Sequence, residues 1–66
     1  MEIQVNGDAR EFPDGSTVAG VLEELGAARP GVAVALDGAV VPRGEWAGVT
    51  VRDGAQLEIL VAVQGG

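Results

Sequence analysis

The chain ends in Gly65 and Gly66, and the carboxylate at this end is the strongest candidate for a reactive group in the sequence. Glycine makes up 11 of the 66 residues, so the pair alone is weakly informative. Its context adds more, because an apolar segment over residues 56–63 runs almost up to it. Glycine lacks a Cβ atom, so a Gly-Gly tail enters narrow channels and adopts almost any backbone conformation. Two interpretations have equal support at this point: the tail delivers the terminal carboxylate of Gly66 into another protein's active site, or it is a frayed terminus without function.

The rest of the chain offers no catalytic group. It contains no Cys and no His, which excludes thiol nucleophiles, imidazole acid–base chemistry, disulfides and the usual zinc sites. Two carboxylate pairs, Asp53 with Glu58 and Glu23 with Glu24, are better explained as solvated surface residues. Neither a phosphate-binding glycine loop nor a calcium loop is present. The sequence therefore predicts no catalytic residue, no metal and no bound cofactor.

Arg43 and Trp46 are the remaining candidates. An anion site at Arg43 is one interpretation, and a salt bridge or an anchor for its loop is the better one. Trp46 is one of only two aromatic residues, so we expect it to fill the core.

Two strands and a turn are predicted at the start of the chain. Met1, Ile3 and Val5 alternate with polar residues, which indicates a strand with one buried face. Asn6-Gly7 is typical of a tight hairpin turn, because both residues accept positive φ. A second strand over residues 8–12 alternates poorly, so we expect it at an edge of the sheet.

One short helix should follow. Ser16 or Thr17 caps it, and Gly26 ends it. Its apolar stripe has the spacing i, i+3, i+4 and i+7. The stripe consists of Val18, Val21, Leu22 and Leu25.

The second half of the chain predicts three more strands. Residues 32–36 are continuously apolar, which suggests a strand covered on both faces. A turn at Asp37-Gly38 leads to a short strand over residues 39–41, and residues 43–50 are predicted to be irregular. Residues 56–63 are apolar on both sides, which favours a central strand. The order β-β-α-β-β-β predicts an α+β domain, in which one mixed sheet packs on one main helix.

Motifs along the whole chain resemble those of the thiamine-biosynthesis sulfur carrier proteins, a ubiquitin-like β-grasp family with a C-terminal Gly-Gly. The most specific is Val41-Pro42-Arg43 followed by Trp46, together with the terminal Gly-Gly. Further matching segments are Asn6-Gly7, Gly15-Ser16-Thr17-Val18, Val34-Ala35-Leu36, Asp53-Gly54 and Ala62-Val63-Gln64-Gly65-Gly66. Asp37, where Asn is more usual, and Ala55, where an acid is more usual, are mild departures. The resemblance implies a β-grasp domain over residues 1–63 and a flexible tail over residues 64–66.

The resemblance also implies a reaction cycle in which the chain is a co-substrate and not an enzyme. A ubiquitin-activating-type adenylyltransferase uses ATP and Mg to adenylate the Gly66 carboxylate. Sulfur from a cysteine desulfurase relay then displaces AMP, and the resulting thiocarboxylate donates its sulfur to thiazole synthase. Gly65, Gln64 and Val63 form the tail that enters the partner's active site. The exposed apolar side of the last strand, at Leu60 and Ala62, is expected to dock the activating enzyme.

Other functions stay open at this point. The same fold and tail suit a sulfur carrier for molybdopterin, cysteine or a secondary metabolite. They also suit a ubiquitin-like protein modifier, although the chain has no Lys on which to build chains of itself. An interaction module with an inert tail is the remaining alternative.

The net charge of −6 disfavours nucleic acid and anionic membrane surfaces as partners. It suits either a basic protein partner or simple solubility. The chain begins with Met1-Glu2-Ile3, without the basic and apolar regions of a signal peptide, so we expect it to be cytoplasmic.

Overall fold

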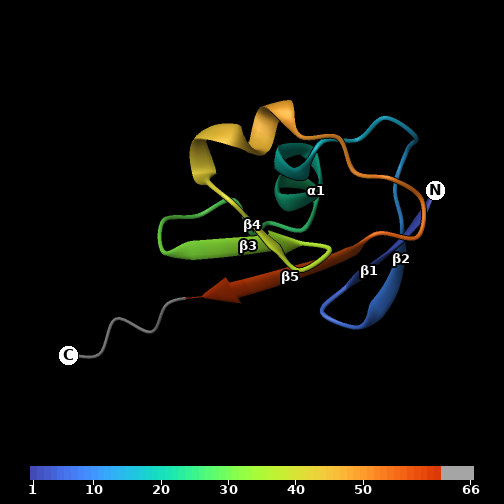
Figure 1. Ribbon diagram of the computed structural model, residues 1–66, viewed down its shortest axis with the longest axis horizontal. Helices are drawn as coiled ribbons and strands as arrows, with labels where there is room; N and C mark the ends of the chain where they lie inside the picture. The colour runs from blue at the N-terminus through green and yellow to red at the C-terminus, as the bar shows by residue number, and fades with distance from the viewer. Residues whose placement is uncertain (62–66) are drawn as a thin grey trace.

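The computed structural model describes residues 1–61, and its strands form one mixed sheet with the order β2-β1-β5-β3-β4 (Figure 1). The elements are β1 (Glu2–Val5), β2 (Asp8–Glu11), α1 (Val18–Glu24), β3 (Val32–Leu36), β4 (Ala39–Val41), the 3-10 helix η1 (Arg43–Gly48) and β5 (Gln56–Val61). β1 and β5 are parallel, and the other neighbours are antiparallel. The predicted order of strands and helix is confirmed.

The first hairpin forms as its sequence predicts. Ile3 and Val5 are buried while Glu2 and Gln4 are exposed, so the alternation of residue types matches the two faces of β1. The turn places Asn6 at φ 51° and Gly7 at φ 88°. β2 lies at the edge of the sheet and is exposed along its whole length, and the charged residues of such an edge discourage pairing with other chains.

Helix α1 has a defined cap at each end. The Thr17 hydroxyl accepts a hydrogen bond from the backbone N–H of Gly20 at 3.1 Å. At the other end Gly26 has φ 69°, and Ala27 N–H donates to the Leu22 carbonyl in the pattern of a Schellman motif. A helix of seven residues does not persist alone in water, so its stability comes from the buried stripe that packs on the sheet.

Both helices, α1 and η1, lie on the same side of the sheet (Figure 1). The side chains that are almost completely buried between the layers are Ile3, Val18, Val21, Leu22, Val34, Val51 and Leu57. The opposite face of the sheet, which we call the open face, carries no helix of the described chain.

Two expectations about the second half of the chain are wrong. β3 is not covered on both faces, because the helices of residues 1–61 lie on one side of the sheet: Val34 is buried, whereas its neighbour Ala33 is exposed. The segment predicted to be irregular contains η1, which begins directly after Pro42. Proline ends β4 because it has no N–H for the strand ladder, and its φ of −58° leads into the helical turns.

The expectations for Trp46 and Arg43 are confirmed. Trp46 is buried, and its indole N–H donates to the Val41 carbonyl at 2.8 Å. The Arg43 guanidinium donates to the Arg29 carbonyl and lies 4.8 Å from the centre of the Trp46 ring. Arg43 therefore anchors the loop before β3 to η1, through a hydrogen bond and a cation–π contact.

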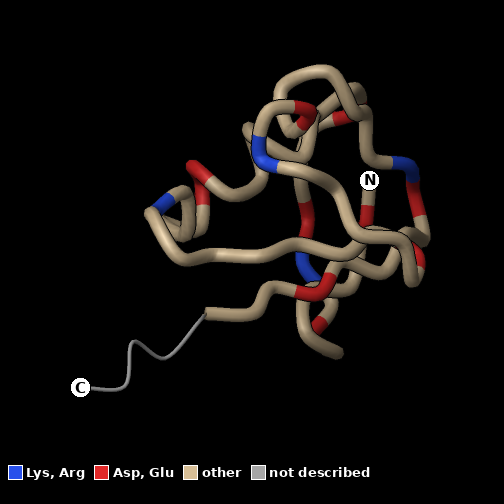
Figure 2. The backbone as a smooth tube through the Cα atoms, turned by 60° about the vertical axis from the view of Figure 1, so that its left-hand side comes forward, with Lys and Arg blue, Asp and Glu red and all other residues tan. Residues whose placement is uncertain are grey.

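The charged residues of the described chain do not form one cluster. Figure 2 shows the Asp and Glu residues spread along the backbone, and their positions fall in strands, turns and both helices. Within residues 1–61, no helix is long and apolar enough to cross a membrane.

Candidate functional site

The candidate site is the last strand, β5, which leads toward the Gly-Gly pair. β5 is the central strand, as predicted, and it has partners on both sides. On one side it pairs with β3 from Leu57 to Val61. On the other side it pairs with β1 only through Gln56 and Leu57. Beyond Leu57, the β1 side of the strand needs another partner for its backbone groups.

Asn6 supplies that partner. Its side-chain oxygen accepts a hydrogen bond from Ile59 N–H at 2.8 Å, and its amide group donates to the Ile59 carbonyl at 3.2 Å. Its own backbone N–H donates to the Leu57 carbonyl at 2.9 Å. Asn6 therefore forms the turn of the first hairpin and also holds β5 at Ile59.

Asp37 plays a similar part at the other end of β5. It is the first residue of the second tight turn, with φ 49°, and its carboxylate accepts a hydrogen bond from Gln56 N–H at 2.9 Å. Its backbone N–H donates to the Gln56 carbonyl at 2.8 Å. Each Asx-Gly turn thus holds the central strand with a side chain, one near its start and one near its end.

The two residues at the described end of β5 are exposed. Leu60 is 63% exposed and lies opposite Ala33 on the open face of the sheet. Val61 is 70% exposed and lies opposite Val32 on the other face. The expectation that Leu60 presents an apolar side chain to solvent is confirmed, and its role in docking stays a prediction.

An apolar hollow of about 230 Å³ adjoins Val61. It lies between the end of α1, the loop before β3 and the end of β5. Its lining consists of Leu25, Gly26, Ala27, Arg29, Pro30, Val32 and Val61. The candidate site therefore has exposed apolar surface on both sides of the strand from which the tail continues.

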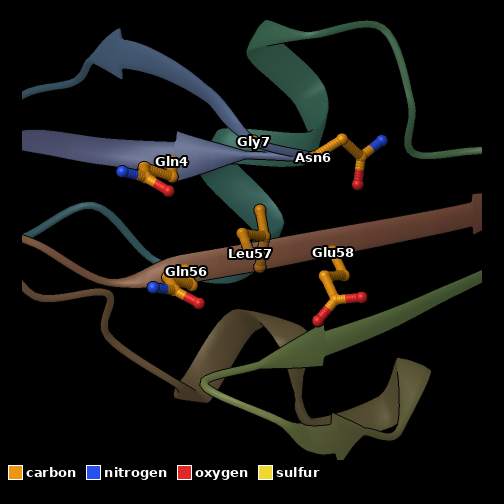
Figure 3. A pocket seen from close by; sticks show the side chains of 6 residues that line it. All are labelled: Gln4, Asn6, Gly7, Gln56, Leu57 and Glu58. Atoms are coloured by element: carbon orange, nitrogen blue, oxygen red, sulfur yellow. The ribbon is translucent and has the colours of Figure 1, made fainter.

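A second, polar hollow of about 370 Å³ lies over β1 and β5, near the first turn (Figure 3). Gln4 and Gln56 are in register on neighbouring strands, and Figure 3 shows their carboxamides on the same side of the sheet. The other residues that line it are Asn6, Gly7, Leu57 and Glu58. This set offers hydrogen bonds and one carboxylate, but no nucleophile and no acid–base pair.

The carboxylates considered as catalytic pairs have structural or solvated positions. Asp53 accepts a hydrogen bond from Glu2 N–H at 2.8 Å, which fixes the start of β1. Glu58 is exposed on the open face, and Glu23 and Glu24 are exposed on α1. Within residues 1–61, no three potential metal ligands come together.

Five residues predicted to matter lie outside the described part of the chain: Ala62, Val63, Gln64, Gly65 and Gly66. Their roles, and the boundary predicted between a domain at residues 1–63 and a tail at residues 64–66, stay predictions.

The sequence reasoning missed the contacts from Asn6 and Asp37 to β5, because it treated both only as turn residues. The signal was an Asx residue at the first position of each turn, since Asn and Asp bind backbone groups readily. Which strand they bind depends on the sheet order, and the turn sequence alone does not encode it.

Comparison with known proteins identifies the group to which this chain belongs. The ThiS family model matches residues 3–66. The sulfur carrier protein ThiS of Escherichia coli is 36% identical over 66 residues, which cover all of both chains. A crystal structure of the thiamine biosynthesis protein ThiS from Geobacter metallireducens superposes with a TM-score of 0.86, at 32% identity, over the whole of both chains. That similarity confirms the ubiquitin-like β-grasp fold.

A longer relative carries a region similar to the whole chain. The thiazole synthase of Paramagnetospirillum magneticum is 39% identical over 66 residues, and the chain spans only 20% of the length of that protein. Taken with the full-length match to the Escherichia coli carrier, the central placement of β5 and the Gly-Gly pair beyond it, these similarities show that the chain belongs to the ThiS family of sulfur carrier proteins.

Proposed function

We propose that this protein carries sulfur as a thiocarboxylate on Gly66 and donates it to thiazole synthase in the biosynthesis of thiamine. As a member of the ThiS family, it is a sulfur carrier and not itself a catalyst. The proposal concerns where the sulfur is held, which enzyme activates the chain and which enzyme receives the sulfur.

The absence of cysteine carries the proposal. A protein without Cys has no thiol on which to hold sulfur as a persulfide, and the sulfur of Met1 is part of its own side chain. A carboxylate is then the group that can accept sulfur, after activation. Among the carboxylates of this chain, that of Gly66 follows a residue without a side chain, so it is the one suited to enter a narrow active site.

The length of the segment between Val61 and the Gly66 carboxylate suits delivery of that carboxylate into a partner's active site. Residues 62–66 follow Val61, and a segment of that length spans at most about 17 Å when fully extended. That reach allows the carboxylate to enter a partner's active site while the sheet rests against the partner's surface.

The chemistry requires two steps on a partner of the ubiquitin-activating type, which uses ATP and Mg. A Gly66 carboxylate oxygen attacks the α-phosphorus of ATP, and pyrophosphate leaves. Sulfide then attacks the acyl carbon of the adenylate: the C–S bond forms, the C–O bond to AMP breaks, and a thiocarboxylate remains. When a persulfide of the cysteine desulfurase relay attacks instead, an acyl disulfide forms and AMP leaves. A thiol of the relay then reduces the S–S bond, becomes oxidised to a disulfide and releases the thiocarboxylate.

Thiazole synthase is the proposed acceptor because relatives with that name contain a region similar to this whole chain. In the proteins of Paramagnetospirillum magneticum and Magnetococcus marinus that region is 20% of the length. A carrier-like region within the same polypeptide as a synthase supports a functional link between the two. The proposed docking residues for the activating enzyme are Leu60 and Ala62, of which Leu60 is exposed on the open face.

Mass spectrometry after incubation with the activating enzyme, Mg-ATP and sulfide tests the proposal. We expect the mass gain of one oxygen replaced by sulfur. Oxidation of Met1 gives nearly the same gain, so the modified residue must be located by digestion. Trypsin cleaves after Arg52, the last basic residue, and releases residues 53–66, which contain neither Met nor Cys.

Sulfur confined to the peptide of residues 53–66, and lost when Gly66 is deleted, supports the proposal. No change in that peptide, while the same mixture modifies the Escherichia coli carrier, would overturn it. An isopeptide between Gly66 and a lysine of another protein would instead identify a protein modifier.

A further inference from the structure

We propose that Asn6 is a positioning residue for the activation of Gly66, because its side chain fixes the direction in which β5 leaves the domain. The inference rests on the proposed function, since it assigns a residue to the delivery of the tail. It concerns a residue of the first turn, at the opposite end of the sequence from the tail.

Asn6 replaces a missing peptide group. β1 ends at Val5, and the chain turns away into β2 at Asn6-Gly7. In β5 the backbone N–H and C=O groups of every second residue point toward β1. After Leu57, the next residue whose backbone needs a hydrogen-bond partner on this side is therefore Ile59. A carboxamide has one carbonyl acceptor and an N–H donor, as a peptide group does, and the Asn6 carboxamide makes both bonds to Ile59. Figure 3 shows it just beyond the end of β1, beside β5.

The contact between Asn6 and Ile59 matters because it lies near the end of β5. Ile59 is two residues before Val61, and on the β1 side the Asn6 carboxamide is the last hydrogen-bond partner of β5 within the described chain. Without it, the end of β5 would be paired on the β3 side alone. A strand paired on one side twists and bends more freely, so the tail would enter a partner's channel in a broader range of directions.

Asparagine fits this position better than other residues. Its φ of 51° lies in the left-handed region, where Asn and Gly are favoured, so the turn restricts the choice of residue. Glycine would satisfy the turn and remove the contact. Aspartate would keep the acceptor for Ile59 N–H but place a negative oxygen beside the Ile59 carbonyl.

The second turn provides a matched control. Asp37 has the same turn position and nearly the same φ, and it also binds β5, but at Gln56, the first residue of the strand. From equivalent turns, Asn6→Gly therefore removes two side-chain hydrogen bonds to β5, and Asp37→Gly removes one. Asp37→Asn keeps the acceptor for Gln56 N–H and removes the charge, while one carboxylate oxygen becomes an NH2 group.

The experiment measures amide hydrogen exchange in each variant, and steady-state adenylation of each variant by the activating enzyme with Mg-ATP. For Asn6→Gly we expect faster exchange at Ile59 N–H, and a kcat for adenylation lowered about tenfold with little change in KM, because surface docking is retained and tail alignment is lost. For Asp37→Gly we expect faster exchange at Gln56 N–H and an almost unchanged kcat. If Asn6→Gly does not fold, Asn6→Asp preserves the turn and tests the same contact.

Two results overturn the inference while leaving the proposed function intact. One is an unchanged kcat for Asn6→Gly although Ile59 exchanges faster. The other is an equal loss of kcat in Asp37→Gly, which would show a general effect of stability. Failure of the unmodified protein to be adenylated would instead reject the proposed function, and this inference with it.

Discussion

The indole N–H of Trp46 donates to the carbonyl of Val41 across a single turn of η1, at 2.8 Å and in a buried position. This bond joins the last residue of β4 to the centre of η1. It satisfies a carbonyl at the strand end, where Pro42 interrupts the ladder.

Replacing Trp46 with Phe should therefore destabilise the domain. The change leaves the Val41 carbonyl without its donor and removes part of a buried ring, and we expect a loss of about 2–4 kcal/mol in the free energy of unfolding. Urea denaturation followed by circular dichroism measures it, because Trp46 is the only tryptophan and the variant loses its fluorescence. A loss below about 0.5 kcal/mol would contradict the importance of this bond.

Gly20 weakens α1 without a compensating role in the fold. It is the third residue of α1 and is exposed, and an added Cβ would meet only the Thr17 hydroxyl, at the ordinary contact distance of 3.4 Å. Gly20→Ala should stabilise the protein by about 0.5–1 kcal/mol, because alanine loses less backbone entropy in a helix.

Gly26→Ala is the matched control for that prediction. It lies in open space but has φ 69°, so we expect a loss of about 1 kcal/mol from backbone strain alone. Thermal denaturation of both variants shows whether Gly20→Ala raises the stability of the domain and Gly26→Ala lowers it, as predicted. A stabilising Gly26→Ala would contradict the left-handed cap.

Leu60→Asp should slow adenylation without unfolding the domain. Leu60 is exposed, so the change costs at most about 1 kcal/mol of folding stability, mainly through strand propensity. In a docking surface the same change buries a charge against the partner, and we expect KM for the carrier to rise at least about tenfold. The measurement is the initial rate of pyrophosphate release over a range of carrier concentrations.

Val40→Asp separates this docking site from a general effect of charge. Val40 is 76% exposed and faces the same side as Leu60, but it belongs to the edge strand β4. We expect its KM to change less than that of Leu60→Asp. Unchanged adenylation of Leu60→Asp would remove Leu60 from the docking surface.

Local patterns predicted the parts of the fold whose causes are local. The alternation in residues 1–5 and the positive φ accepted by Asn6 and Gly7 suffice to specify the first hairpin. The apolar residues on both sides of residues 56–63 indicated a central strand, and the sheet order confirms this for β5 (Gln56–Val61).

The predictions that failed or were missed depend on how distant parts of the chain are arranged in the fold. The apolar run in residues 32–36 is the pattern of a strand buried on both faces, but residues 1–61 provide helices for one face only. The small side chains of Ala33 and Ala35 on the open face were the available sign of this. For the site, Leu60 was correctly expected to be exposed, whereas the contact between Asn6 and Ile59 joins residues 53 positions apart and follows only from the sheet order.

The position of β5 between β1 and β3 also has a mechanical consequence. A partner that draws the segment beyond Val61 into its active site pulls along the axis of β5. The hydrogen bonds to β1 and β3 run across that axis, so the pull acts on them in shear and they resist it together, whereas an edge strand peeled sideways gives up one bond at a time. The domain can therefore stay folded against such a partner while tension is applied beyond Val61.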